Sequence, residues 1–200
     1  MHTLPTNPRS LACPNQVAHR ISLLNAPHVL PLTEFTNSLR KGDVDVPYFD
    51  PFDGGINACI LFLFEKPGPM TATGRGSGFI SRDNDDPTAE ATFRFMKQAG
   101  IERQQSIIWN VMPSWNGSIR TTALELRHGL EHLDGLLALL KCVRTCVLVG
   151  AKAQRAHDYL SERGLKVVVS AHPSMRVKAR WRLRWEEIPA VWAKAKRLPS

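Results

Sequence analysis

The sequence lacks any long apolar run. Its longest uninterrupted apolar stretch, Ala58 to Phe64, has seven residues, whereas a membrane-spanning helix needs about 20. The first residues also lack the apolar segment that a secretory signal places between its basic start and its cleavage site. We therefore expect a soluble, cytoplasmic protein that makes no contact with membranes.

Cysteine is scarce and poorly spaced for cross-linking. The four cysteines include no Cys-x-x-Cys pair, and three of them stand in or beside apolar segments. A chain of 200 residues with 43% apolar side chains can bury a sizeable core without disulfides. We predict free, buried thiols and a single domain over residues 1–200.

Acidic residues are scarce in the second half of the chain. Residues 1–100 hold 9 Lys and Arg against 10 Asp and Glu, whereas residues 101–200 hold 17 against 8. The net charge of +8 therefore arises in the second half. Such an imbalance is typical of a protein that binds a polyanion such as nucleic acid, although a solvated basic face has the same composition.

Four short apolar segments have the composition of buried parallel strands. They are residues 58–64, 106–112, 145–150 and 166–171. Helix-like segments separate them, at residues 87–99, 121–142 and 151–163. The order β-α-β-α-β-α-β predicts a three-layer α/β/α sandwich around a central, mainly parallel four-stranded sheet.

Leucines recur in the longest of these helical segments with spacings of 4, 3, 4 and 3 residues, which is typical of one helix face. They are Leu126, Leu130, Leu133, Leu137 and Leu140. We expect this face to pack against the sheet.

The two ends of the chain differ from its centre. Residues 1–50 are rich in Pro, Asn and short polar residues, with one helix candidate at 32–41. We expect an arm with little regular structure that wraps around the domain. Residues 177–200 form a basic C-terminal segment, which leaves residues 58–176 as the core.

Polar residues follow three of the predicted strands. The segment Glu-Lys-Pro-Gly-Pro at 65–69 follows the first, Asn110 stands in the second, and the fourth runs into His172. Because the carboxyl ends of parallel strands form the ligand-binding edge of such a sheet, we expect these residues to lie together.

The same positions resemble the motifs of the uracil-DNA glycosylase superfamily. Its members carry a Pro-Gly or Pro-Tyr motif after the first strand, a stacking Phe, an Asn that ends the next strand and a late His-Pro-Ser motif. The corresponding residues look like EKPGP at 65–69, Phe79, Asn110 and HPSMR at 172–176. The resemblance covers about residues 58–176 and implies a DNA glycosylase of this fold.

The resemblance implies that a uracil nucleotide is extruded from the DNA stack and bound by these residues. Phe79 would stack on the base. Asn110 would accept from uracil N3–H and donate to O4, a pattern that cytosine reverses. His172 would donate to O2 and stabilise the negative charge on the departing base. Pro67 and Gly68 would complete the uracil-binding site.

Each of these residues also has a structural interpretation. An isolated phenylalanine such as Phe79 usually packs in a core. Asn110 could simply cap a turn, and His172 could end the fourth strand. Their convergence at one edge of the sheet favours the functional interpretation.

The residue that activates the attacking water departs from the superfamily's pattern. The best-known members carry a carboxylate or Asn at the third position of the first motif, where this chain has Lys66. A protonated lysine cannot act as a base, so Lys66 would contact a phosphate or lie exposed. Glu65, which resembles the Glu of the iron–sulfur branch, becomes the candidate, and Asp83 and Asn84 are its rivals.

Basic residues continue past the His-Pro-Ser motif. They would neutralise phosphates beside the base pocket, and the apolar Met175 could wedge into the gap that the base leaves. An edge strand or helix start with solvated arginines fits the same pattern. The expected DNA-binding residues are Ser174, Met175, Arg176, Lys178 and Arg180.

The sequence indicates no cofactor and no metal. The iron–sulfur branch needs two cysteine pairs, but Cys13 has no near partner and residues 114–117 contain no cysteine. His128 and His132 have no third ligand, so we interpret them as a solvated helix face. The run Gly74–Gly78 lacks the ending of a phosphate-binding P-loop and is interpreted as a flexible turn.

Together these observations predict a monomeric, cofactor-free glycosylase of a bacterial nucleoid. It would hydrolyse the N-glycosidic bond of uracil in single- or double-stranded DNA, release free uracil and leave an abasic site for base excision repair. Gly68 stands where the uracil-restricted branch carries a Tyr that excludes the thymine methyl, so other deaminated or mismatched bases are an alternative. A protein that binds uracil-containing DNA without cleaving it, or traps it covalently, is another.

Overall fold

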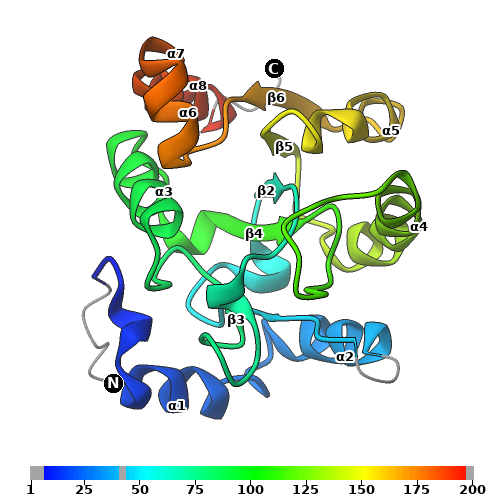
Figure 1. Cartoon of the computed structure of the whole chain (residues 1–200). Coiled ribbons are helices and arrows are strands. Elements are labelled where there is room, and N and C mark those ends of the chain that lie inside the picture. The colour runs from blue at the N-terminus through cyan, green and yellow to red at the C-terminus, as the bar shows by residue number, and fades with distance from the viewer. Residues whose placement is uncertain (1–6, 41–43, 197–200) are drawn as a thin grey trace.

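The structure is a computed structural model that describes residues 7–40 and 44–196. Its centre is a sheet of four parallel strands in the order β4-β2-β5-β6 (Figure 1). The strands are β2 (Ile60–Phe64), β4 (Ser106–Asn110), β5 (Thr145–Val149) and β6 (Lys166–Ser170). The predicted four-stranded parallel sheet is confirmed, and each predicted segment contains one strand.

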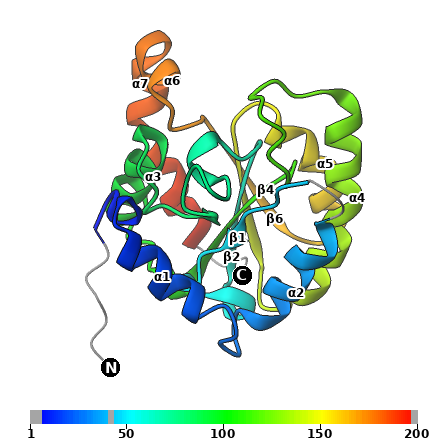
Figure 2. The same ribbon diagram turned by 60° about the horizontal axis from the view of Figure 1, so that its bottom comes forward.

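Helices lie on both sides of the sheet (Figures 1 and 2). One side holds α3 (Pro87–Gln98), α6 (Met175–Arg180), α7 (Arg182–Glu186) and α8 (Ile188–Ala193). The other side holds α4 (Ala123–Leu139) and α5 (His157–Ser161). Every residue of β2, β4 and β5 is buried, as expected for parallel strands that are covered on both faces. The predicted three-layer sandwich is confirmed.

Two of the helices begin where local signals place them. Asp86 caps α3, because its side chain accepts hydrogen bonds from two backbone N–H groups of the first turn. Thr122 and Glu125 form a capping box at the start of α4. The third predicted helix, 151–163, is instead a 3-10 turn (Ala153–Ala156) followed by the short α5. Within the described ranges, none of the helices has the length and apolarity needed to cross a bilayer.

The buried face of α4 only partly matches the leucine spacing. Of the five predicted leucines, Leu133 and Leu140 are fully buried, and the other three are half-buried. A Cβ atom on Gly129 would lie 2.0 Å from the carbonyl oxygen of Val111. At Gly129, α4 therefore comes very close to the backbone that follows β4. The spacing of large apolar residues does not indicate this close approach.

The N-terminal arm is more regular than predicted. It contains α1 (Pro14–Ser22), α2 (Leu30–Leu39) and β1 (Tyr48–Phe49), which pairs in parallel with β3 (Phe79–Ile80). The expectation of little regular structure is therefore wrong, although α2 matches the helix candidate at 32–41. The buried residue of α1 is a charged one, Arg20, so apolar periodicity could not reveal this helix. Residues 1–6 and 41–43 of the arm and 197–200 of the basic C-terminal segment lie outside the described residues.

A buried cluster of six charged residues fastens this arm to the core. We call it the ion cluster, and its members are Arg20, Asp50, Asp53, Arg82, Asp83 and Arg103. Arg103 contacts all three carboxylates, at 2.7, 3.2 and 2.9 Å for Asp50, Asp53 and Asp83. The three positive and three negative charges balance, which is the condition under which buried charges are tolerated.

The cysteines are all free, as predicted, but their burial is not as predicted. Cys146 in β5 is buried, and burial raises the pKa of its thiol well above the usual range. Cys59 is half-buried, whereas Cys13 and Cys142 are exposed. The expectation of buried thiols is therefore correct only for the cysteine inside a strand.

Candidate active site

A cavity of about 450 Å³ opens at the carboxyl edge of the sheet. Its walls come from the ends of β2 and β4, the segment after β2, the turn after β3, the start of α3 and the segment after β6. Seven of the predicted site residues line it: Pro67, Gly68, Asn84, Asn110, His172, Ser174 and Arg176. The structure thus brings together residues that are more than 100 positions apart in the sequence.

Asn110 ends β4, directly beside Phe64 of β2. It is only 4% exposed, yet its side chain lines the cavity. Among the described residues its amide has no hydrogen-bond partner, so Asn110 does not cap a turn. A largely buried amide without a partner is unfavourable in an empty protein, and this one offers a donor and an acceptor to whatever occupies the cavity.

His172 lies in the segment after β6 and lines the same cavity. Its ring packs edge-on against Phe64, with ring centroids 5.7 Å apart. Burial lowers the pKa of His172 below its ordinary value, and the nearby carboxylates of Glu65 and Asp86 only partly oppose this effect. The imidazole is therefore neutral at pH 7 and has one N–H to donate. No residue in the described parts of the chain forms a hydrogen bond with it.

Gly68 leaves a gap in the cavity wall. Its backbone is extended, with φ −100° and ψ 176°, so the conformation does not require glycine. A Cβ atom built on it would meet nothing within 4 Å. The neighbouring Pro67 is buried. The space beside Gly68 is therefore open to a side chain or a ligand group.

Lys66 lines the cavity but is not exposed, so the expectation that it lies exposed is wrong. Its side chain is 4% exposed. Its ammonium donates to Asn116 Oδ1 at 2.8 Å, to the carbonyl of Arg120 at 3.0 Å and to Glu125 Oε1 at 2.6 Å. Lys66 thereby ties the loop after β4 to the cavity wall, and Ile119 of that loop lines the cavity.

Glu65 and Asp83, two of the three candidates for holding the attacking water, do not line the cavity. Glu65 accepts a hydrogen bond from the backbone N–H of Lys152 at 2.9 Å. The carboxylate of Asp83 is completely buried in the ion cluster, between Arg20 and Arg103. Asp83 is close to Phe79 in the sequence, but this proximity does not show that its side chain lies in the ion cluster and not at the cavity.

Asn84, the third candidate, does line the cavity. Its Oδ1 accepts from Ser77 Oγ at 2.6 Å, and its Nδ2 donates to the carbonyl of Phe79 at 2.8 Å. These two bonds fix the orientation of the amide. One lone pair and one N–H remain available, which is what is needed to hold a water molecule.

Phe79 does not face the cavity, so its prediction as the stacking residue disagrees with the structure. It is 1% exposed and packs against Tyr48, with ring centroids 6.2 Å apart. Because side chains alternate along β3, its neighbour Ile80 lines the cavity instead. The alternative interpretation of Phe79 as a core residue agrees with this position. Phe64 is the aromatic residue at the cavity, and its place at the end of the first apolar segment was the available signal.

The predicted DNA-binding residues lie at the start of α6 and along it. Ser174 caps this helix by accepting from the backbone N–H of Val177 at 3.4 Å. Met175 is 47% exposed, and Arg176 reaches the cavity wall. The ammonium of Lys178 lies 4.6 Å from the centre of the Trp185 ring. The remaining residue, Arg180, is exposed near the end of α6. The segment is a helix and not an edge strand.

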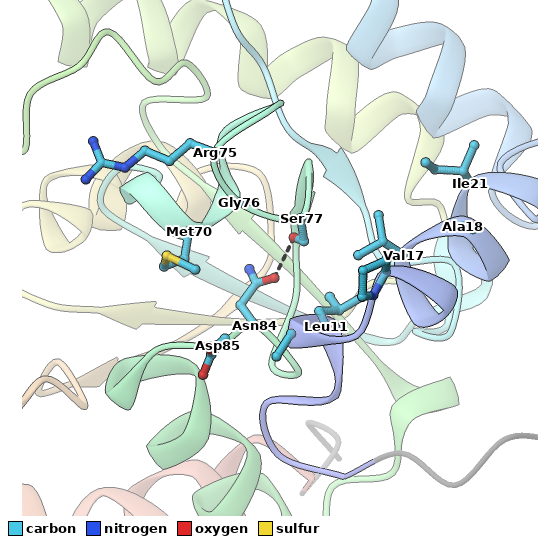
Figure 3. Close-up of a pocket in the computed structure, with 12 residues that line it drawn as sticks. Leu11, Val17, Ala18, Ile21, Met70, Arg75, Gly76, Ser77, Asn84 and Asp85 are labelled. Atoms are coloured by element: carbon cyan, nitrogen blue, oxygen red, sulfur yellow. Dashed lines mark hydrogen bonds between the residues drawn. The ribbon is translucent and has the colours of Figure 1, made fainter.

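A second cavity, of about 470 Å³, adjoins the first. Figure 3 shows Leu11 and Val17 on one side of it and Met70 on the other, with Asn84 between them. The dashed line marks the hydrogen bond from Ser77 to Asn84. Met70 and Asn84 line both cavities, so this asparagine forms part of the wall that separates them.

The histidines and glycines for which we expected no chemistry lie outside the first cavity. His128 and His132 are exposed on α4. Gly74 and Gly78 have φ angles of 79° and 78°, which places them in a turn that favours glycine. In the portion of the chain that the structure describes, no group of three or more His, Cys, Asp or Glu side chains could hold a metal ion.

Comparison with known proteins points to one family. Residues 51–196 match the uracil DNA glycosylase superfamily, and this range includes every segment that lines the first cavity. No curated protein matches the chain. A solution NMR structure from Methanosarcina acetivorans, whose assignment as a uracil DNA glycosylase is provisional, has 16% sequence identity and a TM-score of 0.49, over 70% of this chain and 92% of that chain. The family assignment therefore rests on the sequence match.

Proposed function

This chain belongs to the uracil-DNA glycosylase superfamily, and we propose that it hydrolyses the N-glycosidic bond between uracil and deoxyribose in DNA. The proposal rests on the shared location of Asn110 and His172. Both line one cavity at the carboxyl edge of the sheet, and in the described residues neither side chain has a hydrogen-bond partner.

The amide of Asn110 matches the edge of uracil. Its oxygen accepts from N3–H and its nitrogen donates to O4, whereas cytosine presents an acceptor at N3 and a donor at the adjacent position. With the amide in this orientation, cytosine would leave both of its polar atoms without a hydrogen-bond partner. In this orientation Asn110 selects uracil over cytosine.

The neutral imidazole of His172 donates to O2 of the extruded uracil. Cleavage of the glycosidic bond leaves negative charge on the departing base, and a donor that is already in place stabilises this charge most in the transition state. The edge-on contact with Phe64 holds the ring in position.

Asn84 is the residue we assign to the attacking water. It is the only one of the three predicted water-holding residues that lines the cavity. An amide orients a water molecule but does not remove its proton. The water therefore attacks the sugar cation first, and its proton then passes to the departing uracil anion. Glu65 acts indirectly, because its charge lies close enough to influence the pKa of His172.

The test uses purified protein and labelled single-stranded and duplex oligonucleotides that contain one uracil, followed by alkaline cleavage at abasic sites. We expect cleavage at uracil. The variants Asn110→Ala and His172→Ala should each lower the single-turnover rate by roughly 100-fold or more, the usual effect of losing one such donor. Asn25→Ala and His128→Ala are the matched controls, because both residues are exposed. Absence of abasic sites from the wild-type reaction, or variants as active as the controls, would contradict the proposal.

A broader base spectrum is a second candidate, and the open space beside Gly68 favours it. A pyrimidine with a substituent at C5, or a purine such as hypoxanthine, needs more room than uracil. The same assay with thymine opposite guanine and with hypoxanthine separates the two candidates. A covalently trapped complex would survive denaturing electrophoresis, so the same reaction analysed on a denaturing gel tests the trapping alternative.

A further inference from the structure

Helices α6 and α7 lie side by side (Figure 1) and form a basic ridge that reaches the cavity through Arg176. We define this ridge as residues 175–186. Its five basic residues are Arg176, Lys178, Arg180, Arg182 and Arg184. Its one acidic residue, Glu186, pairs with Arg182 at 2.7 Å. Within the described chain no other cation of the ridge pairs with a carboxylate, so the ridge is complementary to a polyanion.

The ridge also exposes large apolar side chains. Met175 is 47% exposed, Trp181 45% and Leu183 75%. Arginines that surround exposed apolar groups are typical of a surface that binds both the phosphates and the bases of an unpaired nucleic acid strand. A duplex would present its phosphates to the same arginines, but its stacked bases would offer no free face.

The two tryptophans of the ridge have different roles. Trp185 packs edge-on against Phe95 of α3, with ring centroids 4.6 Å apart, and anchors the ridge to the body of the protein. Trp181 contacts no other ring in the described residues. The guanidinium of Arg180 lies 4.7 Å from the centre of the Trp181 ring, which leaves much of the ring accessible. Trp181 is therefore not needed to hold the ridge in place.

The ridge is continuous with the cavity. Arg176 belongs to the ridge and also lines the cavity. Trp181 directly follows α6 and is five residues after Arg176. At a rise of about 1.5 Å per residue, the two residues are roughly 8 Å apart along the helix axis. A DNA strand whose extruded nucleotide occupies the cavity would therefore pass along the ridge within reach of Trp181.

We infer that Trp181 stacks on an unpaired base of the strand that carries the extruded nucleotide, while Arg176 and Arg184 contact its phosphates. The protein accordingly prefers single-stranded DNA to a duplex. This inference rests on the proposed function, because it assumes that the strand beside the cavity is DNA. It adds a binding site outside the pocket and a preference for one form of the substrate.

The test measures binding by fluorescence anisotropy to a labelled single-stranded oligonucleotide without uracil and to a hairpin duplex of the same composition. We expect Trp181→Ala to weaken binding to the single strand roughly tenfold, which is typical of losing one base–aromatic stack. Binding to the hairpin should change less than about twofold. Trp181→Phe retains a ring and should restore most of the single-strand affinity. Arg184→Ala should reduce the salt dependence of binding to both forms.

Leu183→Ala is the matched control, because it removes exposed apolar area from the same ridge without removing a ring. We expect it to bind both oligonucleotides like the wild type. Single-strand binding by Trp181→Ala at the wild-type level would overturn the inference. An equal loss in Leu183→Ala would overturn it too, since it would indicate a general apolar contact of the kind a protein partner makes. Thermal unfolding of each variant checks that it remains folded.

The two proposals can fail separately. The oligonucleotides contain no uracil, so a protein that excises nothing can still show the Trp181 effect on single strands. Conversely, uracil excision by a protein whose Trp181→Ala variant binds normally would leave the proposed function intact and refute the stacking site alone.

Discussion

The ion cluster and the cavity wall both contain buried polar side chains, but they differ in whether these side chains have partners in the protein. Each carboxylate of the cluster lies within 3.3 Å of a guanidinium nitrogen. In the described residues, the side chains of Asn110 and His172 have no hydrogen-bond partner. Asp83 and Asn84 are adjacent in the sequence, but Asp83 belongs to the ion cluster and Asn84 lines the cavity. Paired buried groups hold the arm in place, whereas unpaired ones are the groups available to a ligand.

The largest effect should follow from breaking the cluster. Arg103→Met removes the one residue that contacts all three carboxylates, and an uncompensated buried charge typically costs about 3–5 kcal/mol. Asn110→Ala, measured in the same way, should change the free energy of unfolding by less than about 1 kcal/mol, because no hydrogen bond is lost. Urea denaturation at pH 7 measures both.

The control for Arg103→Met is Arg94→Ala. Arg94 pairs with Glu90 at the surface, and its side chain is 65% exposed, so its loss should have little effect on stability. Equal destabilisation by Arg103→Met and Arg94→Ala would mean that the cluster does not fasten the arm. A strongly destabilised Asn110→Ala would mean that this side chain has a structural role.

A smaller effect should follow from filling the cavity. Gly68→Tyr occupies space that is empty in the structure, so it should lower activity on thymine opposite guanine about tenfold relative to uracil, as a lost or added group in a pocket typically does. Gly68→Ala should show the same trend more weakly. Single-turnover rates on the two substrates measure it. An equal loss on uracil would show that the gap is not where a C5 substituent lies.

The smallest effect should appear in the pH dependence of stability. Folding lowers the pKa of His172, so between that value and about 6.5 the unfolded chain binds more protons than the folded one. Stability is therefore lost as the pH falls from 6.5. His172→Gln should lose less stability than the wild type between pH 7 and pH 5 in urea denaturation. Identical losses in the two proteins would mean that burial does not disfavour the imidazolium.

The fold was predictable where short segments carry the signal. The apolar segments at 58–64 and 145–150 became strands because a run of large apolar residues between turns can be satisfied only inside a sheet. Asp86 caps α3 through its own first turn, so that boundary is also local. The positions of Asn110 at the end of β4 and of His172 just after β6 followed from the topology, because parallel strands bring their carboxyl ends to one edge.

Two of the errors share a cause. The arm was predicted to have little regular structure because the buried anchor of α1 is Arg20, and a buried arginine looks like a solvated one until its partners are known. Lys66 was expected at the surface for the same reason. Phe79 was predicted to stack on the uracil base for a different reason: a motif does not show which face of a two-residue strand is covered.

The sequence by itself determined the strands, the helix caps and the sheet edge at which Asn110 and His172 meet, because these depend on neighbouring residues and on the order of elements. Only the tertiary structure decided which polar side chains are paired and which are free. Arg20 reaches Asp83 across 63 positions, and Lys66 reaches Arg120 across 54. Such partners are set by the packing of distant segments, so whether a charge serves the structure or the site is a property of the folded chain.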